Sequence, residues 1–351
     1  MPAAVFVVPG SIDTRTGGSL YDRRMAEGLR WRGWDIAMVE LAGEFPQPTA
    51  AAVASAAKAL AAIPDGSPVV MDGLALSALP DLIERETARL RVVALVHLPL
   101  AADLSIDAEI RTRLAAAERR ALDASALIVV TGMATLGLLA QYALPRGRVV
   151  VVEPGTDPAP LARGSGGPGV CLLCAATVNS GKGHDVLLSA LAAVPSQEWR
   201  LTCAGSLTRD PATADRARGL VQQLELADRV TLVGELNADA LAACYDAADV
   251  FVLATRRETY GMAVAEALAR GLPVVSTTTG AIPDLVGPGA GLLAPPGDAE
   301  AFSSALARVI SDVDLRARLA AGARAVRDRL QTWEVAAARM EAALQAVNGY
   351  V

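Results

Sequence analysis

The sequence has few aromatic residues, little cysteine and no excess of basic charge. Aromatic residues make up 4% of the 351 positions and hydrophobic residues 52%, so a large core must be built mainly from Ala, Val and Leu. A net charge of -6 argues against nucleic acid as a partner, because nucleic-acid binders present a basic face. The chain also lacks a run of about 18 apolar residues and a basic segment ahead of an apolar one near its start. We therefore expect no membrane span, no targeting segment and a cytoplasmic location.

The four cysteines are too few and too scattered for a disulfide framework. Cys171 and Cys174 form a CxxC pair, but they fall in the apolar run 170–176, which is typical of a buried strand. Residues three apart on a strand point to opposite faces, so this pair is not expected to share a metal ion or to form a disulfide. We predict buried, inert thiols.

Short β-branched runs alternate with Ala- and Leu-rich helical patterns along the chain. This alternation predicts parallel sheets that are covered by helices on both faces. The predicted strands form two sets of six, at residues 5–8, 35–40, 69–71, 92–96, 126–130 and 149–152, and at 170–176, 199–204, 230–233, 250–254, 274–276 and 291–293. We therefore predict two doubly wound α/β domains, with a cleft where the carboxyl ends of their strands face each other.

A segment rich in Pro and Gly, residues 153–169, separates the two sets and predicts a linker. It contains a GxGxxG at 164–169, but a dinucleotide fingerprint must follow a strand and open a helix, whereas these glycines precede a strand. The Gly-Lys dipeptide at 181–182 is likewise no P-loop, because Gly183 stands where that motif requires Ser or Thr.

Two loops after predicted strands carry groups that suit a phosphate. Gly17 and Gly18 precede the predicted helix 21–32 and would let backbone N–H groups approach an anion, although a tight strand-to-helix turn explains them equally well. Lys182 precedes the next predicted helix, 186–193, where its charge and the helix dipole can act on a diphosphate. A solvated surface lysine is the alternative.

The most specific signal is Glu258-Thr-Tyr-Gly-Met-Ala-Val-Ala-Glu266, which follows the predicted strand 250–254. If most of this interval is helical, its two carboxylates lie on the order of 10–12 Å apart. That separation suits hydroxyls at the two ends of a nucleotide sugar, with the helix N-terminus at Gly261 facing the phosphates. Glu266 lies in an apolar helical run, where an unpaired carboxylate is costly, so a solvated face explains it poorly. For Glu258 that explanation is adequate.

These motifs resemble the family-four retaining glycosyltransferases of the GT-B fold. The resemblance rests on the E-x7-E motif Glu258–Glu266 and on Lys182-Gly-His184, and it covers nearly the whole chain, most strongly residues 171–298. Further matching segments are Val230-Thr-Leu-Val-Gly234, Ala248-Asp-Val-Phe-Val-Leu253, Gly280-Ala-Ile-Pro-Asp284 and Gly291-Leu-Leu-Ala-Pro-Pro-Gly-Asp298. The resemblance implies two facing Rossmann-like domains, with residues 1–156 and a crossover helix at 333–351 for the acceptor, and residues 168–332 for the nucleotide-sugar donor.

The resemblance also implies roles for individual residues. Glu258 would hold sugar hydroxyls, Lys182 would neutralise the leaving diphosphate, and His97 would lie beside the sugar. The remaining donor contacts would come from Gly17, Gly18, Thr177, Val233, Thr259, Tyr260, Gly261, Met262 and, through the ribose, Glu266. No metal ion or other cofactor is expected. Without the resemblance, a histidine after an apolar strand is more often structural, and Asp72, the acceptor-site candidate, is better explained as a helix cap.

Thr177 departs from the family pattern, because many members carry an arginine there beside the diphosphate. A hydroxyl supplies no charge, so we expect Lys182 and the helix N-termini to carry more of the leaving-group stabilisation, with Arg256 or Arg257 as candidates to compensate. One predicted helix carries four arginines that suit contact with anionic lipid, although such a pattern is usually a solvated face: Arg111, Arg113, Arg119 and Arg120.

The sequence thus predicts an enzyme that moves a hexose-type sugar from a nucleotide diphosphate sugar to a hydroxyl of a small-molecule, glycan or lipid acceptor. We expect the transfer to need no metal ion and to retain the anomeric configuration. Two alternatives stay open: a sugar-nucleotide epimerase on the same architecture, and a non-catalytic protein that binds the donor.

Overall fold

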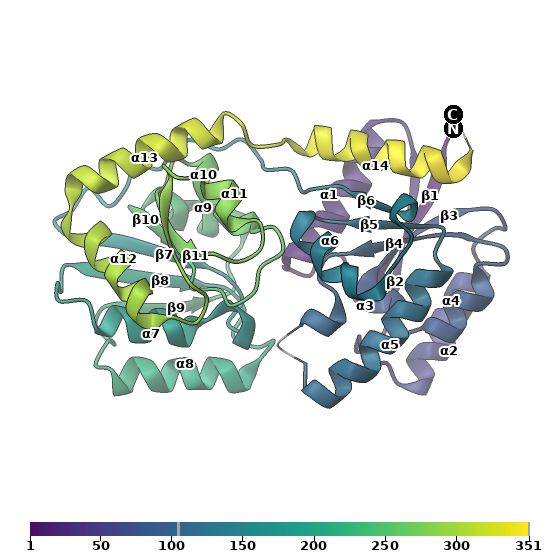
Figure 1. The fold of residues 1–351 in the computed structure, drawn as a ribbon, viewed down its shortest axis with the longest axis horizontal. Coiled ribbons are helices and arrows are strands. Elements are labelled where there is room, and N and C mark those ends of the chain that lie inside the picture. The colour runs from purple at the N-terminus through teal and green to yellow at the C-terminus, as the bar shows by residue number, and fades with distance from the viewer. Residues whose placement is uncertain (104–105, 350–351) are drawn as a thin grey trace. The chain divides into compact units, whose positions relative to one another are not determined.

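The computed structural model describes residues 1–103 and 106–349, which form two units (Figure 1). The first unit is Met1–Gly155 with Gln331–Val351, and the second is Thr156–Leu330. Each unit contains one six-stranded parallel sheet with flanking helices, so the predicted α/β class and the two predicted sets of strands are confirmed. Of the predicted linker 153–169, residues 156–169 group with the second unit.

The sheet of the first unit has the strand order β2-β1-β3-β4-β5-β6. Its strands are β1 (Ala3–Pro9), β2 (Asp35–Leu41), β3 (Pro68–Asp72), β4 (Arg91–Val96), β5 (Leu127–Val130) and β6 (Val149–Val151). Its helices are α1 (Gly17–Trp31), α2 (Ala50–Ala61), α3 (Gly73–Leu76), α4 (Pro80–Glu86), α5 (Ala108–Ala124), α6 (Met133–Leu139) and α14 (Trp333–Asn348), with short 3-10 turns at Leu100–Ala102, Ala140–Tyr142 and Arg146–Arg148.

Both faces of this sheet are buried, which explains why its strands are continuous apolar runs rather than alternating ones. In β4, Val92 and Val96 pack into one hydrophobic cluster, whereas Val93 and Leu95 pack into another on the opposite face. Side chains of successive strand residues point to opposite sides, so an apolar residue is needed at every position.

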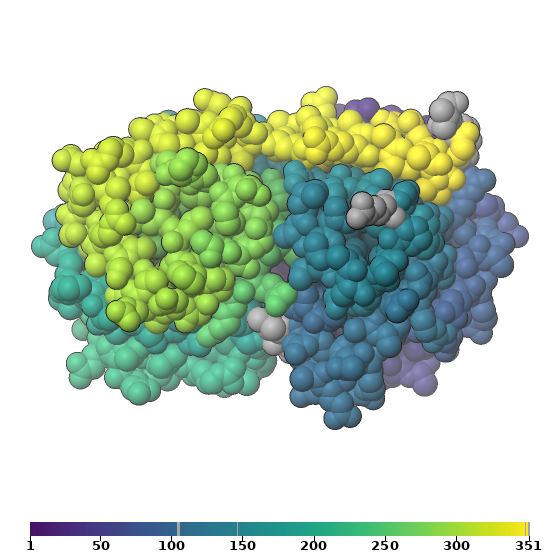
Figure 2. Space-filling model, in the orientation of Figure 1, coloured from purple at the N-terminus to yellow at the C-terminus, as the bar shows by residue number. Residues whose placement is uncertain are grey.

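The C-terminal helix α14 returns to the first unit and packs against α1. Its side chains Met340 and Leu344 are fully buried in the same cluster as Val93. At its outer edge, Glu341 accepts hydrogen bonds from the side chains of Arg32 and Trp34. The atoms of α14, in yellow, form part of the surface of this unit (Figure 2).

The sheet of the second unit has the order β12-β11-β10-β7-β8-β9. Its strands are β7 (Val170–Ala175), β8 (Trp199–Ala204), β9 (Val230–Gly234), β10 (Val250–Val252), β11 (Val274–Thr277) and β12 (Gly291–Ala294). Its helices are α7 (His184–Ala192), α8 (Pro211–Gln223), α9 (Ala238–Asp246), α10 (Met262–Ala269), α11 (Ile282–Val286), α12 (Ala299–Ser311) and α13 (Val313–Arg327), with a 3-10 turn at Ser180–Lys182.

Each sheet contains one point where the chain changes its direction of travel across the strands. In the second unit the chain moves from β7 to β9 in one direction and from β10 to β12 in the other, so the switch lies between β7 and β10. In the first unit it lies between β1 and β3. Open α/β sheets bind ligands beyond the carboxyl ends of the strands at this point.

Within residues 1–103 and 106–349, none of the helices combines the length and apolar character that crossing a bilayer requires.

Candidate functional site

An ion pair occupies the switch point of the second sheet. Lys182 follows β7, and Glu258 follows the neighbouring strand β10. The Nζ atom of Lys182 donates a hydrogen bond to Oε2 of Glu258 at 2.6 Å, and their side chains are 28% and 14% exposed. We expected each residue to meet a different part of the donor; the structure adds that the two contact each other.

The Lys182 turn is held by the side chain of Asn179 and by close packing at Gly183. The side chain of Asn179 accepts hydrogen bonds from the N–H groups of Gly181 and Lys182, both at 3.1 Å. Gly183 has φ +65°, and a Cβ there would lie 2.1 Å from the carbonyl oxygen of Ala254. Only glycine therefore allows this turn to lie so close to the end of β10.

Helix covers only the second part of the interval between the two motif glutamates, so the condition on which the estimated separation depended is not met. Helix α10 begins at Met262, and its cap Gly261 has φ +97°, which ends helical geometry on the side of Glu258. The turn instead packs against Gly280, where a Cβ would lie 2.0 Å from the carbonyl oxygen of Glu258. The separation estimated from helical rise does not apply.

Glu266 lies on α10 and is hydrogen-bonded in the second unit. The hydroxyl of Tyr245, on α9, donates to its Oε2 at 3.0 Å. Burial, and then the charge of Glu266, raise the pKa of Tyr245, so this hydroxyl keeps the proton that it donates. Arg270 stacks over the Tyr245 ring at 4.4 Å and adds a positive charge nearby. Tyr245 was not among the predicted site residues, because its position in a helical run is the only signal that the sequence offers.

The other expected donor residues occupy three places. Thr259, Tyr260, Gly261 and Met262 form the turn that opens α10, and the N–H of Thr259 donates to Oε1 of Glu258 at 3.2 Å. Thr177 follows β7, and Val233 lies on the edge strand β9 with 39% of its surface exposed. A single exposed apolar side chain is common on protein surfaces, so the exposure of Val233 does not by itself indicate a ligand.

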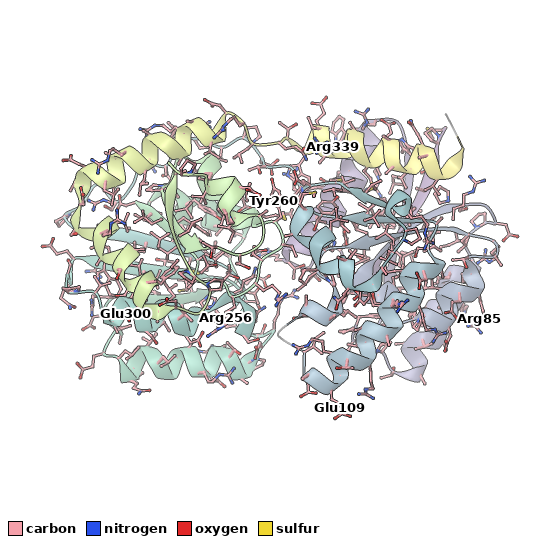
Figure 3. All side chains as sticks on the ribbon, in the orientation of Figure 1. Arg85, Glu109, Arg256, Tyr260, Glu300 and Arg339 are labelled. Carbon is pink, nitrogen blue, oxygen red and sulfur yellow. The ribbon has the colours of Figure 1, made fainter. Side chains whose placement is uncertain are left out.

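Arg256, a candidate to supply the charge that Thr177 lacks, is paired within the second unit. Its guanidinium donates two hydrogen bonds to Asp185, at 2.8 and 2.7 Å, and lowers the pKa of that carboxyl. Arg256 is labelled in Figure 3. Arg257 has a buried Nε with no hydrogen-bond partner among the described residues. The expected compensation by Arg256 therefore has no support in this structure.

The first unit places His97 between two carboxylates near its own switch point. His97 follows β4, and its Nε2 lies 3.0 Å from Oδ1 of Asp22 and 3.4 Å from Oδ2 of Asp72. The two aspartate side chains are only 2% and 8% exposed, whereas that of His97 is 22% exposed. Asp72 also caps α3 by accepting a hydrogen bond from Leu74 N–H at 2.7 Å, which confirms the cap interpretation and adds the contact with His97.

The two carboxylates make His97 a cation. Burial opposes the charged form, but the attraction of Asp22 and its hydrogen bond outweigh this effect, and Asp72 adds to them. Together they raise the pKa of His97 to about 10. The imidazole is therefore protonated at neutral pH and has no free nitrogen with which to accept a proton.

Helix α1 begins at Gly17, so the prediction that Gly17 and Gly18 form a loop ahead of the helix is wrong. Thr16 caps the helix by accepting a hydrogen bond from Ser19 N–H, which makes the glycines its first two residues. A Cβ at Gly18 would lie 3.2 Å from Cδ2 of His97, so the glycine makes room for the ring. Asp22 lies four residues later on the same helical face, a spacing that could have identified it.

Three of the four arginines of α5 contact other groups of the first unit. Arg120 contacts Asp81 and Glu84, and Arg119 contacts Asp123. Arg111 donates to the carbonyl of Asp103. Contact with anionic lipid through this helix gains no support.

Two Rossmann-like units define the class of the chain, the GT-B fold. Sucrose-phosphate synthase from Thermosynechococcus elongatus shares this fold with a TM-score of 0.83 and 22% identity, over 99% of this chain and 100% of that one. Alr3699/HepE from Anabaena, solved in complex with UDP-glucose, is similar with a TM-score of 0.78 and 16% identity, over 97% of this chain and 99% of that one.

A family model matches part of the second unit. Residues 166–326 match the family described as glycosyl transferases group 1. D-inositol 3-phosphate glycosyltransferase from Xylanimonas cellulosilytica is 35% identical over 178 residues, which cover 50% of this chain and 42% of that protein. The corresponding protein of Jonesia denitrificans is 29% identical over 252 residues, 66% of this chain and 59% of that protein. The chain thus spans about half the length of the curated relatives it matches.

Proposed function

We propose that the chain is a retaining glycosyltransferase that moves a hexose-type sugar from a nucleotide diphosphate sugar to an acceptor hydroxyl. The observation that carries this proposal is the Lys182–Glu258 pair at the switch point of the second sheet, with Glu266 on the helix that follows. The second unit would bind the donor and the first unit the acceptor. The four free thiols fit a reducing compartment such as the cytoplasm.

A positive charge and two helix N-termini without side-chain caps support a donor site in the second unit. Helices α7 and α10 both begin after a glycine and have no side-chain cap, so their first N–H groups can donate to phosphate oxygens. Lys182 adds a mobile positive charge beside them. When a diphosphate binds, the ammonium can exchange Glu258 for a phosphate oxygen, and this exchange frees the Glu258 carboxylate to accept hydrogen bonds from sugar hydroxyls.

The identity of the donor is suggested by the relatives and neighbours. HepE was solved with UDP-glucose, and the curated relatives are named as glycosyltransferases. UDP-hexoses are therefore the first donors to test. Because a bound donor raises stability by mass action, the test is a thermal-shift panel of nucleotide sugars on the full chain. Donor breakdown or rearrangement without any acceptor would instead favour an epimerase.

We propose retention of configuration because the candidate residues include no suitable base. Inversion needs a group that takes the acceptor proton on the face opposite the leaving group. His97 is already protonated, and Asp72 is committed to a helix cap and to His97. Glu258 is assigned to the sugar. We propose that the departing phosphate accepts the proton while the acceptor attacks the same face, and that His97 acts as a fixed cation.

The stereochemical test is the anomeric coupling in the proton NMR spectrum of the product. An α-linked donor should give an α-linked product. A β-linkage from an α-donor would contradict retention and would require a base that the candidates above do not provide.

We also propose that transfer needs no divalent ion at the diphosphate. The sequence motif Asp312-Val-Asp314, the one pair of the kind that metal-using enzymes present, serves as a helix cap: Asp312 accepts a hydrogen bond from Leu315 N–H at the start of α13. The initial rate with a chelator in excess should equal the rate with added Mg2+ or Mn2+. A rate that only either ion restores would refute metal independence.

A further inference from the structure

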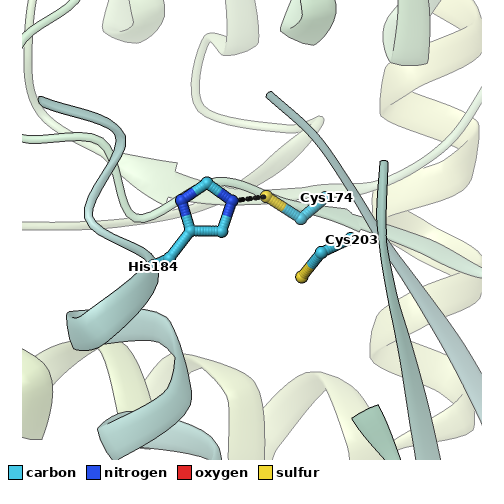
Figure 4. Close-up of side chains that lie close together, drawn as sticks. All are labelled: Cys174, His184 and Cys203. Atoms are coloured by element: carbon cyan, nitrogen blue, oxygen red, sulfur yellow. Dashed lines mark hydrogen bonds between the residues drawn. The ribbon is translucent and has the colours of Figure 1, made fainter. Parts of the chain in front are cut away.

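Two cysteines and one histidine lie close together in the core of the second unit, near the Lys182 turn. Cys174 on β7 and Cys203 on β8 are opposite each other in the sheet, and His184 is the first residue of α7. Their exposed fractions are 1%, 2% and 2%. Figure 4 shows the His184 ring edge directed at the Cys174 sulfur, with 3.8 Å between Nε2 and Sγ.

Of the two thiols expected to be buried, Cys174 is buried, whereas Cys171 is only half-buried. The residue that Cys174 meets is not Cys171, its CxxC neighbour, but Cys203 on the adjacent strand, which points to the same face. The hydrogen bond from Cys203 lowers the pKa of the Cys174 thiol. The buried Nδ1 of His184 has no hydrogen-bond partner among the described residues. A buried imidazole and a buried thiolate are both costly unless another group stabilises them.

We propose that Cys174, Cys203 and His184 bind one Zn2+ ion. Their candidate ligand atoms all lie within 4.8 Å of one another. At the tetrahedral angle, zinc bonds of about 2.3 Å to sulfur and about 2.0–2.1 Å to nitrogen place a sulfur and a nitrogen ligand roughly 3.5–3.6 Å apart. The observed separation of 3.8 Å is longer by roughly 0.2–0.3 Å, so a small shift of either side chain would bring both atoms to the ion.

The donor set selects the ion by charge and by softness. Two thiolates balance the two charges of Zn2+, so the bound ion adds no net charge to the core. Thiolate and imidazole ligands favour zinc over Mg2+ and Ca2+, which prefer oxygen. The corresponding group of the first unit, Asp22, Asp72 and His97, already contains a cation in the protonated His97 and therefore does not suit a second one.

The site would act as a structural link rather than in the transfer reaction. It joins β7, β8 and the start of α7, and His184 stands two residues after Lys182. A bound ion would therefore fix the end of the Lys182 turn. Gly183, in the same turn, already packs closely against the backbone of Ala254. This inference does not depend on the proposed glycosyltransferase activity.

The test is the zinc content of the full chain, refolded with an equimolar amount of Zn2+ and then freed of unbound ion. Mass spectrometry of the metal should find roughly one zinc per chain. Cys203→Ser and His184→Gln should lose it, whereas Cys171→Ser, on the same strand but outside the cluster, should keep it. Zinc-free wild-type protein, or zinc retained by both cluster variants, would overturn the proposal.

A second measurement tests the site even if the Cys203→Ser and His184→Gln variants fail to fold. Wild-type protein refolded with Co2+ should show the absorption of thiolate-to-cobalt charge transfer, and Cys171→Ser should show it equally. Cobalt bound without that absorption would place the ion on oxygen ligands elsewhere and would contradict the site.

Discussion

Lys182 in the second unit and His97 in the first are both cations near the carboxyl edge of their sheets, but the two are held in different ways. Lys182 meets the carboxylate of Glu258 through a flexible side chain that is 28% exposed. His97 is fixed between Asp22 and Asp72, both buried. A mobile ammonium with a carboxylate partner can exchange that partner for a phosphate, whereas an imidazolium between two carboxylates keeps its position and its proton. The second unit therefore suits a ligand that arrives charged, and the first offers a fixed charge.

The largest expected effect is that of Lys182→Ala. Removing the mobile cation should lower kcat by about 10²–10³, the loss typical of one group that stabilises developing negative charge. Binding of a free nucleoside diphosphate should weaken by about 10- to 150-fold, because a hydrogen bond to a charged group is lost. Lys58→Ala is the matched control, since Lys58 is exposed on α2 and is the only other lysine of the chain. Equal kinetics for the two variants would contradict the exchange of partners.

The two motif glutamates should separate binding from transfer. Glu266→Ala should weaken binding of the free nucleoside diphosphate by about 10-fold or more, because the ribose contact is lost. Glu258→Ala should leave that binding nearly unchanged and lower kcat, because its assigned partner is the sugar. Calorimetry with the free diphosphate measures the difference, and Tyr245→Phe controls for loss of the Glu266 hydrogen bond. Equal losses in both alanine variants would refute the division of roles.

Alanine substitutions at one glycine in each unit should change the free energy of unfolding by different amounts. Gly183→Ala should destabilise the protein by about 1–3 kcal/mol, because φ is +65° and the new Cβ would meet a backbone oxygen at 2.1 Å. Gly18→Ala should have an effect near zero, because the helical preference of Ala, up to about 1 kcal/mol, offsets the contact with His97 at 3.2 Å. Urea midpoints measure both. A larger loss for Gly18→Ala would mean that the first unit is the more tightly constrained.

The charge of His97 is tested by its titration. The chain has two histidines, so the His97 signal in imidazole NMR spectra is identified by His97→Gln. In the wild type we expect protonation to persist to about pH 10. Asp22→Asn should bring the pKa down, because it removes the stronger of the two carboxylate partners, and Asp72→Asn should lower it less. Titration of the wild type near the ordinary value of about 6.5 would contradict a fixed cation.

The same shift sets the sign of a pH effect on stability. A raised pKa in the folded state means that the contribution of His97 is fully present below about pH 6.5 and is lost as the pH rises to about 10. The free energy of unfolding should therefore fall between these values, and it should fall less in Asp22→Asn. An increase in stability of the wild type across this window that Asp22→Asn does not share would contradict the assignment.

The strands could be predicted from the sequence, but contacts between residues far apart in the sequence could not. A parallel sheet buried on both faces requires a continuous apolar run, so β4 and β7 are visible in the sequence alone. The start of α1 was missed because two glycines favour a turn, although Thr16 supplies the cap. Asp22 is 75 residues from His97. Pairing over such distances depends on the order of the strands, which local patterns do not encode.

The most direct test of the donor site is calorimetric titration of free UDP into the full chain and into its Lys182→Ala and Glu266→Ala variants. We predict saturable binding to the wild type and weaker binding to both variants, with the Lys58→Ala control unchanged. If the wild type binds no UDP or any other nucleoside diphosphate, or binds it with the same affinity as both variants, the assignment of the donor site to Lys182 and Glu266 is contradicted.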